Sequence, residues 1–339
     1  MEPDYIGHNE VASLRRSWST EETQAYIRNL PIWEGEIQIE QKFGGLQNRT
    51  YFITDADGTR FAVRCGFDQF RTRQTAIVEC TIAAHKLKLG PCLRYWEPAL
   101  TVTDFIDNPK MTAEMLREPK MMAHTLERLK MLHEGSGAVE QTMSYWWPFH
   151  TVRRYLNEME AGKPETGNQP SKWIDEVPLF RRVTDTLEQV IRPYIPVFTH
   201  NDTAYVNMIF NDDDEVMFID WDGGGYSNRK WDIAEMLMWL ESDEEMDRYA
   251  LGCYFGKVDE DEMGLLLKEH LAFKVMAALR LITEIMESDL DPNFYLSPEE
   301  QAVSMQEFFP GQKAHLNGLI DLLRPGFETY WAQYEKIYG

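Results

Sequence analysis

Short apolar segments separated by turn residues make up the first third of the chain. Alternation of β-branched or aromatic residues with polar ones, bounded by Gly44-Gly45 and by Asp55 to Gly58, predicts a meander of strands. The expected strands cover residues 37–43, 50–54, 60–64, 92–96 and 99–105. Helices are expected at 17–29, where Ser19 or Thr20 precedes two glutamates, and at 72–89.

Helical spacing dominates after residue 107. Helices are expected up to Gly135, over 180–192 and over most of the chain from Trp231 onward, with a polar loop at 161–171. Short strands are expected at 197–199, 208–210 and 216–219. The pattern predicts an α+β protein with a small β-rich lobe at 1–107 and a larger helical lobe at 108–339.

Charge and cysteine content narrow the function classes. The chain of 339 residues has 34 Lys and Arg against 56 Asp and Glu, a net charge of −22, which disfavours nucleic acid or anionic membranes as partners. The four cysteines are scattered, which favours a reducing compartment, and the N-terminus has no apolar core typical of a signal peptide. No apolar run is long enough to insert into a membrane. A cytoplasmic location is expected, and association as a homodimer stays open.

The most informative stretch runs from His200 to Asn207. Asp202 and Asn207 are five residues apart, and Asp220 follows an apolar strand after the next turn. This is the layout of a kinase catalytic loop and metal site, in which one carboxylate orients the attacking hydroxyl. An amide oxygen and a second carboxylate are ligands that suit Mg²⁺. Each residue alone is more often a turn former or helix cap, so the joint occurrence carries the hypothesis.

Further features occur in the order that such a site requires. Gly44-Gly45, with Asn48 after it, lets the backbone approach phosphates, although most such pairs are plain turns. Arg64 ends the third strand, and Glu79 on the next helix is its expected partner. The last strand of the small lobe ends at the segment Thr103, Asp104, Phe105 and Ile106. Asp232 either anchors the catalytic loop or caps its own helix.

Together these residues resemble the choline/ethanolamine kinase and aminoglycoside phosphotransferase superfamily, whose fold is protein-kinase-like. The Gly44–Asn48 loop and an arginine at position 64 make the likeness greatest for the choline kinase branch. The other matching segments are Glu79, Gly90-Pro91, Asp104–Ile106, Leu129–His133, His200–Asn207, Asp220–Asp222 and Asp232. The resemblance implies an enzyme that uses ATP and Mg²⁺ to phosphorylate the hydroxyl of a small cationic metabolite.

The same resemblance implies individual roles. Asp202 would be the catalytic base, and Asn207 and Asp220 would bind Mg²⁺. Arg64, held by Glu79, would contact the nucleotide phosphates beneath Gly44, Gly45 and Asn48. The segment Thr103, Asp104, Phe105 and Ile106 would receive adenine. His200 is expected to brace the loop, and His133 to lie in the core.

The resemblance leaves two roles open for Asp222, which could bind a second metal ion or the ammonium group of the acceptor; in the second case the acceptor site combines it with aromatic residues. Trp239 and Tyr226, together with Trp146, Trp147 and Phe149, are candidates for a box that holds an ammonium group through cation–π attraction. An amino alcohol like choline or ethanolamine is favoured. The alternatives are an aminoglycoside or another acceptor of the same superfamily, and a nucleotide-binding pseudokinase scaffold.

Overall fold

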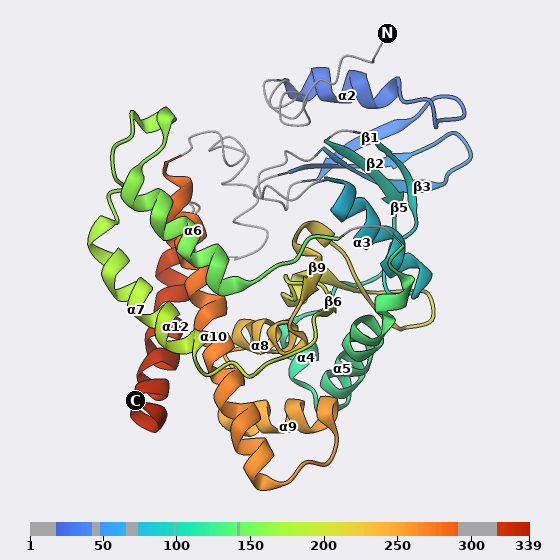
Figure 1. Cartoon of the computed structure of the whole chain (residues 1–339). Helices are drawn as coiled ribbons and strands as arrows, with labels where there is room; N and C mark the ends of the chain where they lie inside the picture. Colours follow the sequence, from blue (N-terminus) through green and yellow to red (C-terminus); the bar gives the residue numbers. More distant parts are fainter. Residues whose placement is uncertain (1–17, 43–47, 66–73, 98, 141–142, 291–316) are drawn as a thin grey trace.

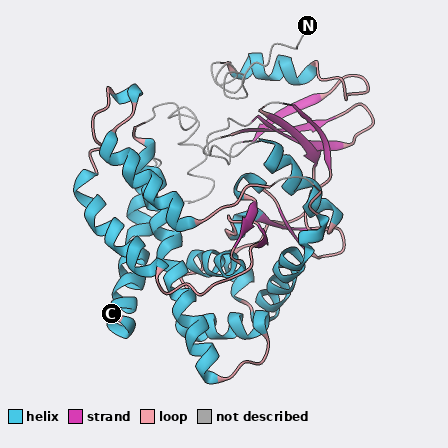
Figure 2. Cartoon of the chain, viewed as in Figure 1, coloured by secondary structure: helices cyan, strands magenta, loops and turns pink. Residues whose placement is uncertain are grey.

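A five-stranded sheet forms one end of the molecule and helices form the other (Figure 1). The computed structural model describes residues 18–42, 48–65, 74–97, 99–140, 143–290 and 317–339. Outside the large sheet, the strands of the described residues are short and lie among the helices (Figure 2). The α+β, two-lobed fold class is confirmed, while the division at residue 107 stays a prediction.

The sheet is antiparallel throughout, in the order β1-β2-β3-β5-β4. Its strands are β1 (Gln38–Lys42), β2 (Arg49–Thr54), β3 (Arg60–Cys65), β4 (Leu93–Glu97) and β5 (Leu100–Asp104). Val63 at the centre lies opposite Tyr51 on one side and Val102 on the other, and all three are fully buried. Alternate residues therefore bury one face of the sheet.

Helix α2 (Thr20–Arg28) covers this buried face. Its first turn is closed by a capping box, in which the Ser19 hydroxyl accepts the N–H of Glu22 and the Glu22 carboxylate accepts the N–H of Ser19. Ile27 and Leu30 pack into the apolar cluster of the sheet. Of the two cap candidates, Ser19 is the N-cap, and the helix begins at Thr20, inside the predicted range 17–29.

The helical lobe is built around one long, buried helix, α10 (Glu260–Ser288). It packs on α6 (Pro148–Ala161), α7 (Val177–Glu188), α8 (Arg229–Trp239), α9 (Glu244–Phe255) and α12 (Asn317–Tyr338). The lobe also contains α4 (Ala113–Arg117) and α5 (Pro119–Glu134). None of the helices among the described residues is long and apolar enough to span a membrane.

Two small antiparallel pairs lie between the sheet and the helices. Strand β7 (Met208–Phe210) pairs with β8 (Val216–Phe218), as the sequence predicted. Strand β6 (Val197–Thr199) pairs with β9 (Gly225–Ser227), a strand that the sequence pattern did not predict. Helix α6 was not predicted from the sequence either. Isolated glycine-rich segments carry no periodicity, so β9 depends on its partner strand for its conformation.

Helix α3 (Gln74–Lys86) lies between the sheet and the helical lobe and is hydrogen-bonded to the latter. The carbonyl of Leu89, just after the helix, accepts the N–H of Phe218 at 2.8 Å. Arg128 donates to the carbonyls of Lys88 and Val216, at 2.6 and 3.0 Å. The end of α3 is therefore attached to β8 and α5.

Candidate active site

One buried carboxylate holds the loop between β6 and β7. Oδ2 of Asp232 accepts the N–H of His200 at 2.9 Å, and Oδ1 accepts the N–H of Asn201 at 2.8 Å. Asp232 is fully buried, and the N-cap of its own helix is a different residue, Asn228. Of the two roles that the sequence left open for Asp232, the geometry supports the anchoring of the loop.

Helices α5, α8 and α9 support this anchor. His133 Nε2 donates to Oδ2 of Asp232 at 3.0 Å, and its Nδ1 accepts the hydroxyl of Tyr254 at 2.7 Å. The Thr203 N–H donates to Glu235 at 2.9 Å, and the Thr203 hydroxyl donates to the carbonyl of Asp232 at 2.6 Å. Buried, charge-assisted hydrogen bonds are strong, so the loop backbone is held in one arrangement.

Asp202 lies on this fixed loop, and two neighbours orient it. Nδ2 of Asn207 donates to Oδ2 of Asp202 at 2.9 Å and to its backbone carbonyl at 3.0 Å. His200 Nε2 donates to the carbonyl of Ile219 at 2.9 Å, while its Nδ1 accepts the N–H of Asp202 at 3.3 Å. Both nitrogens of His200 are thus engaged with the backbone, which fits the bracing role expected for it.

Asp220 follows β8 in a left-handed backbone conformation, with φ 66° and ψ 68°. Non-glycine residues in this region store strain and are concentrated at functional sites. Oδ1 of Asp220 lies 2.8 Å from the Arg64 guanidinium. The same guanidinium donates both bonds of a fork to Asp222, each at 2.7 Å. Asn48 Nδ2 also donates to Asp222, at 3.1 Å.

The expected ion pair between Arg64 and Glu79 is replaced by these contacts. Glu79 is buried on α3, and its Oε1 accepts the N–H of Glu140 at 2.6 Å. The carboxylates that face Arg64 belong to Asp220 and Asp222, which the short turn after β8 carries toward β3. Sequence spacing predicted a partner on the neighbouring helix, whereas tertiary packing brings two acids from the other lobe.

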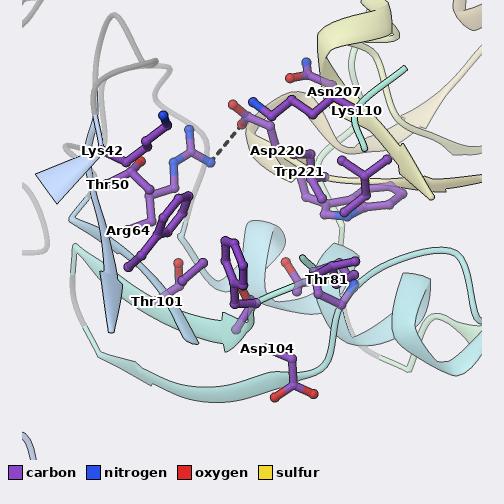
Figure 3. A pocket seen from close by; sticks show the side chains of 18 of the residues that line it. Lys42, Thr50, Arg64, Thr81, Thr101, Asp104, Lys110, Asn207, Asp220 and Trp221 are labelled. Carbon is purple, nitrogen blue, oxygen red and sulfur yellow. Dashed lines mark ion pairs between the residues drawn. The ribbon is translucent and has the colours of Figure 1, made fainter. Parts of the chain in front are cut away.

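A cavity of about 350 Å³ opens between the sheet and the helical lobe (Figure 3). Lys42, Thr50 and Arg64 reach into it from the strands, and Asn207, Asp220 and Trp221 face them from the other lobe. Asn48 also lines it, while Gly44 and Gly45 lie outside the described residues. The apolar side chains of its wall come from both lobes: Phe52, Ala62, Ile77, Val206, Ile209 and Ile219.

The segment Thr103–Ile106 forms one wall of this cavity. The Asp104 carboxylate binds Arg94 on β4, at 2.5 and 2.9 Å, and points away from the cavity (Figure 3). The N–H of Phe105 donates to the carbonyl of Arg60 at 3.1 Å. Asp104 can therefore contribute only its backbone to a bound molecule in this arrangement.

A second cavity of about 260 Å³ lies on the other side of Asp220. Asp202, Asp220 and Asp222 form its acidic wall, and Arg64 also lines it. The remaining wall comes from the segment before α6, from α6 itself, from the loops around Asn201 and Gly223, and from α10, through Ser144, Tyr145, Trp146, Thr151, Arg154, Tyr155, Asn201, Gly223 and Arg280. Arg64 and Asp220 line both cavities, so the two cavities meet at this ion pair.

Two residues expected in the acceptor site lie elsewhere. Trp239 packs against the apolar cluster around α10, and the Tyr226 side chain packs against the cluster around α5. The backbone of Tyr226 nevertheless shapes the cavity, since its N–H donates to the Ser144 carbonyl at 2.8 Å and its carbonyl accepts the Trp146 N–H at 2.9 Å. Of the aromatic candidates, Trp146 lines the cavity.

Burial raises the pKa values of two acids that line the second cavity, Asp202 and Asp222, and of Glu235, which lies outside its lining. Burial raises the pKa of Asp202, although the nearby Arg280 opposes the shift and Asp220 adds to it. Burial likewise raises the pKa of Asp222 to about 6 against the effect of Arg64. For Glu235, burial raises the pKa to about 8, opposed by Arg280. Raised carboxyl pKa values in a cavity are typical of acid–base sites.

Several cavity residues were not singled out from the sequence. Lys42 and Lys110 line the first cavity, and Arg154 and Arg280 line the second. Lys42 ends β1 just before the glycine pair, and a strand-end cation there was a usable signal. Arg154 and Arg280 lie within helices, where a charged residue is ordinarily solvated, so only the packing of α6 and α10 reveals them.

The donor atoms between the cavities suit a hard cation. Nδ2 of Asn207 is used by Asp202, which leaves its Oδ1 available, and Asp220 supplies carboxylate oxygens. Within the described ranges, no group of three or more His, Cys, Asp or Glu side chains is arranged to hold a metal ion. Mg²⁺ needs no such cage, because it binds through one or two protein ligands, substrate phosphates and water. The residues present therefore fit Mg²⁺.

Fold and site together define the class: a kinase for small molecules with a two-lobed, protein-kinase-like architecture. The sequence matches the family model for choline/ethanolamine kinase over residues 63–261, which is more than half of the chain. The chain therefore belongs to the choline/ethanolamine kinase family. The matched range contains Arg64, Asp202, Asn207, Asp220 and Asp232. None of the curated proteins compared with the sequence matches it.

Solved structures of this superfamily share the fold. An ethanolamine kinase from Plasmodium vivax is 13% identical with a TM-score of 0.66, and the alignment covers 97% of this chain and 95% of that one. A choline/ethanolamine kinase family protein from Mesorhizobium loti is 18% identical with a TM-score of 0.61, covering 94% of each chain. A spectinomycin phosphotransferase in complex with ADP and spectinomycin is 13% identical with a TM-score of 0.54, covering 91% and 99%. At these identities the likeness shows the fold alone.

Proposed function

We propose that this protein transfers the γ-phosphoryl group of ATP, with Mg²⁺, to the hydroxyl of a small amino alcohol. The observation that carries the proposal is the meeting of the two cavities at Arg64 and Asp220, with Asp202 on the second cavity. A phosphoryl donor in the first cavity and a hydroxyl in the second would face each other across this junction. In-line transfer requires that arrangement.

The first cavity suits a nucleotide. Apolar side chains from both lobes can enclose a planar base, with the backbone of Thr103–Ile106 at its edge. Lys42, Arg64 and Lys110 would face the phosphates, and Asn48 also lines this cavity. Arg64 would exchange its bonds to Asp220 and Asp222 for phosphate oxygens as the nucleotide enters.

Asn207 and Asp220 would hold Mg²⁺, which when bound neutralises charge on the transferred phosphoryl group. Asp202 would orient the acceptor hydroxyl and take its proton. The raised pKa that burial gives Asp202 makes it a better proton acceptor than an exposed aspartate. Release of Asp222 from Arg64 would leave a carboxylate for the amine of the acceptor.

The second cavity favours a small acceptor over a large one. Its volume of about 260 Å³ lies below the range of about 300–1,000 Å³ that is typical of sites for drug-sized ligands. A multi-ring aminoglycoside would need more room. The aromatic side chains of Tyr145 and Trp146, together with three aspartates, favour an ammonium-bearing molecule.

The substitution Asp202→Asn tests the proposal. It keeps the shape of the side chain and removes the base, so phosphoester formation should fall by about 10²–10⁴-fold. Nucleotide binding should persist, measured as a Mg-ATP-dependent rise in melting temperature. Asp213→Asn, on the exposed turn between β7 and β8, is the control and should retain full activity. Equal product formation by Asp202→Asn and the parent would refute the assignment.

A scaffold without catalysis is the second candidate. It requires a fold that binds nucleotide but forms no product with any hydroxyl acceptor. The joint presence of Asp202, Asn207 and Asp220 in one arrangement counts against it. Thermal stabilisation by Mg-ATP without phosphoester formation across a broad acceptor panel, followed by ³¹P NMR, would favour the scaffold.

A further inference from the structure

The charges around the second cavity balance, which is unexpected for a site that binds only a cation. Asp202, Asp220 and Asp222 are matched by Arg64, Arg154 and Arg280. Arg64 belongs to the junction with the first cavity. The two remaining arginines come from α6 and α10, on the wall formed by the helices. Their other contacts show which of them is available for a ligand.

Arg280 is already committed to protein carboxylates. Its Nη1 donates to Glu284 at 2.8 Å, and its Nη2 donates to Glu235 at 3.1 Å. Arg280 is 8% exposed, so these two carboxylates balance a buried cation, while its Nε–H has no hydrogen-bond partner among the described residues. Its positive charge also acts on Asp202, whose pKa it lowers against the effect of burial. Arg280 therefore serves the protein's own acids.

Arg154 is differently placed. Its contact with a carboxylate is a 3.5 Å approach to Glu158, one turn along the same helix, and its side chain is 28% exposed. Across the described residues, its guanidinium makes no hydrogen bond to any partner. Helical i, i+4 pairs of this kind contribute only a few tenths of a kcal/mol, about 0.3–0.5, so they hold a guanidinium weakly. Its five N–H donors remain available to a molecule in the cavity.

Arg154 also occupies a position that an ammonium group would otherwise take. Its guanidinium lies 4.6 Å from the centre of the Tyr155 ring, and Tyr155 lines the cavity. A cation stacked on this ring disfavours a second cation there. The wall formed by Arg154 therefore attracts an anionic group, whereas Asp202 and Asp222 attract an amine.

We propose that the acceptor is zwitterionic: besides its hydroxyl and amine it carries a carboxylate, which Arg154 binds. The planar guanidinium matches the two oxygens of a carboxylate and can donate a bond to each. This inference rests on the proposed function, since it names the class of acceptor for the same reaction. Arg154 is then a residue that determines specificity, and Asp202 remains the base.

Matched acceptors test the carboxylate directly. Serine is ethanolamine with a carboxylate on the carbon that bears the amine, and homoserine bears the same relation to 3-aminopropan-1-ol. Initial rates with Mg-ATP, with product identified by ³¹P NMR, give kcat/KM for each. In each pair that is turned over, kcat/KM should be more than about 10-fold higher for the carboxylate-bearing acceptor, which corresponds to one charge-assisted hydrogen bond.

Variants of Arg154 assign the effect to this residue. Arg154→Gln should lower kcat/KM for carboxylate-bearing acceptors by about 10–100-fold, mainly through KM, and leave carboxylate-free acceptors nearly unchanged. Arg154→Lys should restore part of the loss, since it restores the charge without the fork. Arg153→Gln is the control, because Arg153 precedes it on α6 but binds Asp185 and Glu188 and does not line the cavity.

The outcomes separate this inference from the proposed function. If the parent enzyme prefers the carboxylate-free acceptors, the zwitterionic acceptor is overturned and the kinase assignment stands. The same holds if the parent prefers the carboxylate-bearing acceptors but Arg154→Gln keeps that preference. An equal fall in kcat for every acceptor also overturns it, because Arg154 would then act on the transferred phosphoryl group. If neither the carboxylate-bearing nor the carboxylate-free acceptors give product, under conditions in which the protein binds Mg-ATP, both the zwitterionic acceptor and the proposed function are overturned.

Discussion

The anchor beneath the catalytic loop makes a quantitative prediction. In Asp232→Asn, one carboxylate oxygen becomes an NH₂ group of almost the same size, so only charge and hydrogen bonding change. An amide oxygen in the place of Oδ2 keeps the bonds from His200 and His133, but the NH₂ group then faces the N–H of Asn201. One buried donor is left without an acceptor, and the two remaining bonds lose their charge.

The magnitude follows from these contacts. An unsatisfied buried N–H costs about 1–3 kcal/mol, and the change from a charged to a neutral acceptor costs about 1 kcal/mol for each remaining bond. Because Asp232 is fully buried, water cannot compensate. We expect the free energy of unfolding to fall by about 3–5 kcal/mol. Asp202 lies one residue beyond Asn201, so kcat should also fall by about 10²-fold through misplacement.

Urea unfolding followed by tryptophan fluorescence measures the first quantity, and initial rates measure the second. Asp213→Asn makes the same chemical change on an exposed turn and should stay within about 0.5 kcal/mol of the parent. A loss below about 1 kcal/mol in Asp232→Asn, with unchanged kcat, would show that the loop does not depend on this carboxylate.

Three further predictions concern the base, the acceptor wall and a second buried acid. Because burial raises the pKa of Asp202, the acid limb of the pH–rate profile should lie above the ordinary aspartate value of 3.8, and a limb at or below it contradicts the assignment. In Gly225→Ala the new Cβ would lie 2.4 Å from the Ser144 carbonyl oxygen, so KM for the acceptor should rise while KM for ATP stays constant. Gly252→Ala is the control, because nothing lies within 4 Å of its new Cβ, and equal effects of the two substitutions would refute the steric argument. Burial raises the pKa of Glu287 from 4.5 to about 7, so folding favours its neutral form: its contribution to stability is complete below pH 4.5 and lost as pH rises through about 7. Glu287→Gln should remove up to about 3 kcal/mol of this pH dependence in urea titrations at successive pH values, and an unchanged slope would exclude Glu287 as its source.

The parts of the site that were predictable from the sequence are local. The catalytic loop and the strand that precedes Asp220 are close in sequence, so the spacing of Asp202 and Asn207 already indicated their shared role. The sequence left two roles open for Asp232, the cap of its own helix and the anchor of the catalytic loop, because either role suits an acidic residue near a helix start. The three-dimensional contacts, and not the spacing, distinguish them.

The parts that could not be predicted depend on packing between distant elements. Arg64 was expected to pair with Glu79 because the two lie on adjacent elements of the chain. In the fold, two acids from the helical lobe form ion pairs with Arg64 instead. Trp239 and Tyr226 were candidates by residue type, and type alone does not say which side of a helix or strand faces a cavity. Arg154 was not singled out, since α6 was not predicted and its neighbour Arg153 looks equivalent in sequence.

The attachment of α3 has a consequence for control of the enzyme. In protein kinases the corresponding helix carries the glutamate that pairs with the phosphate-binding cation, and its displacement switches activity off. Here Glu79 holds the backbone at Glu140, and Leu89 at the end of α3 holds β8. A swing of α3 would break these bonds and leave the contacts of Arg64 with Asp220 and Asp222 in place, so in this arrangement the position of α3 and that of the guanidinium are set by separate contacts.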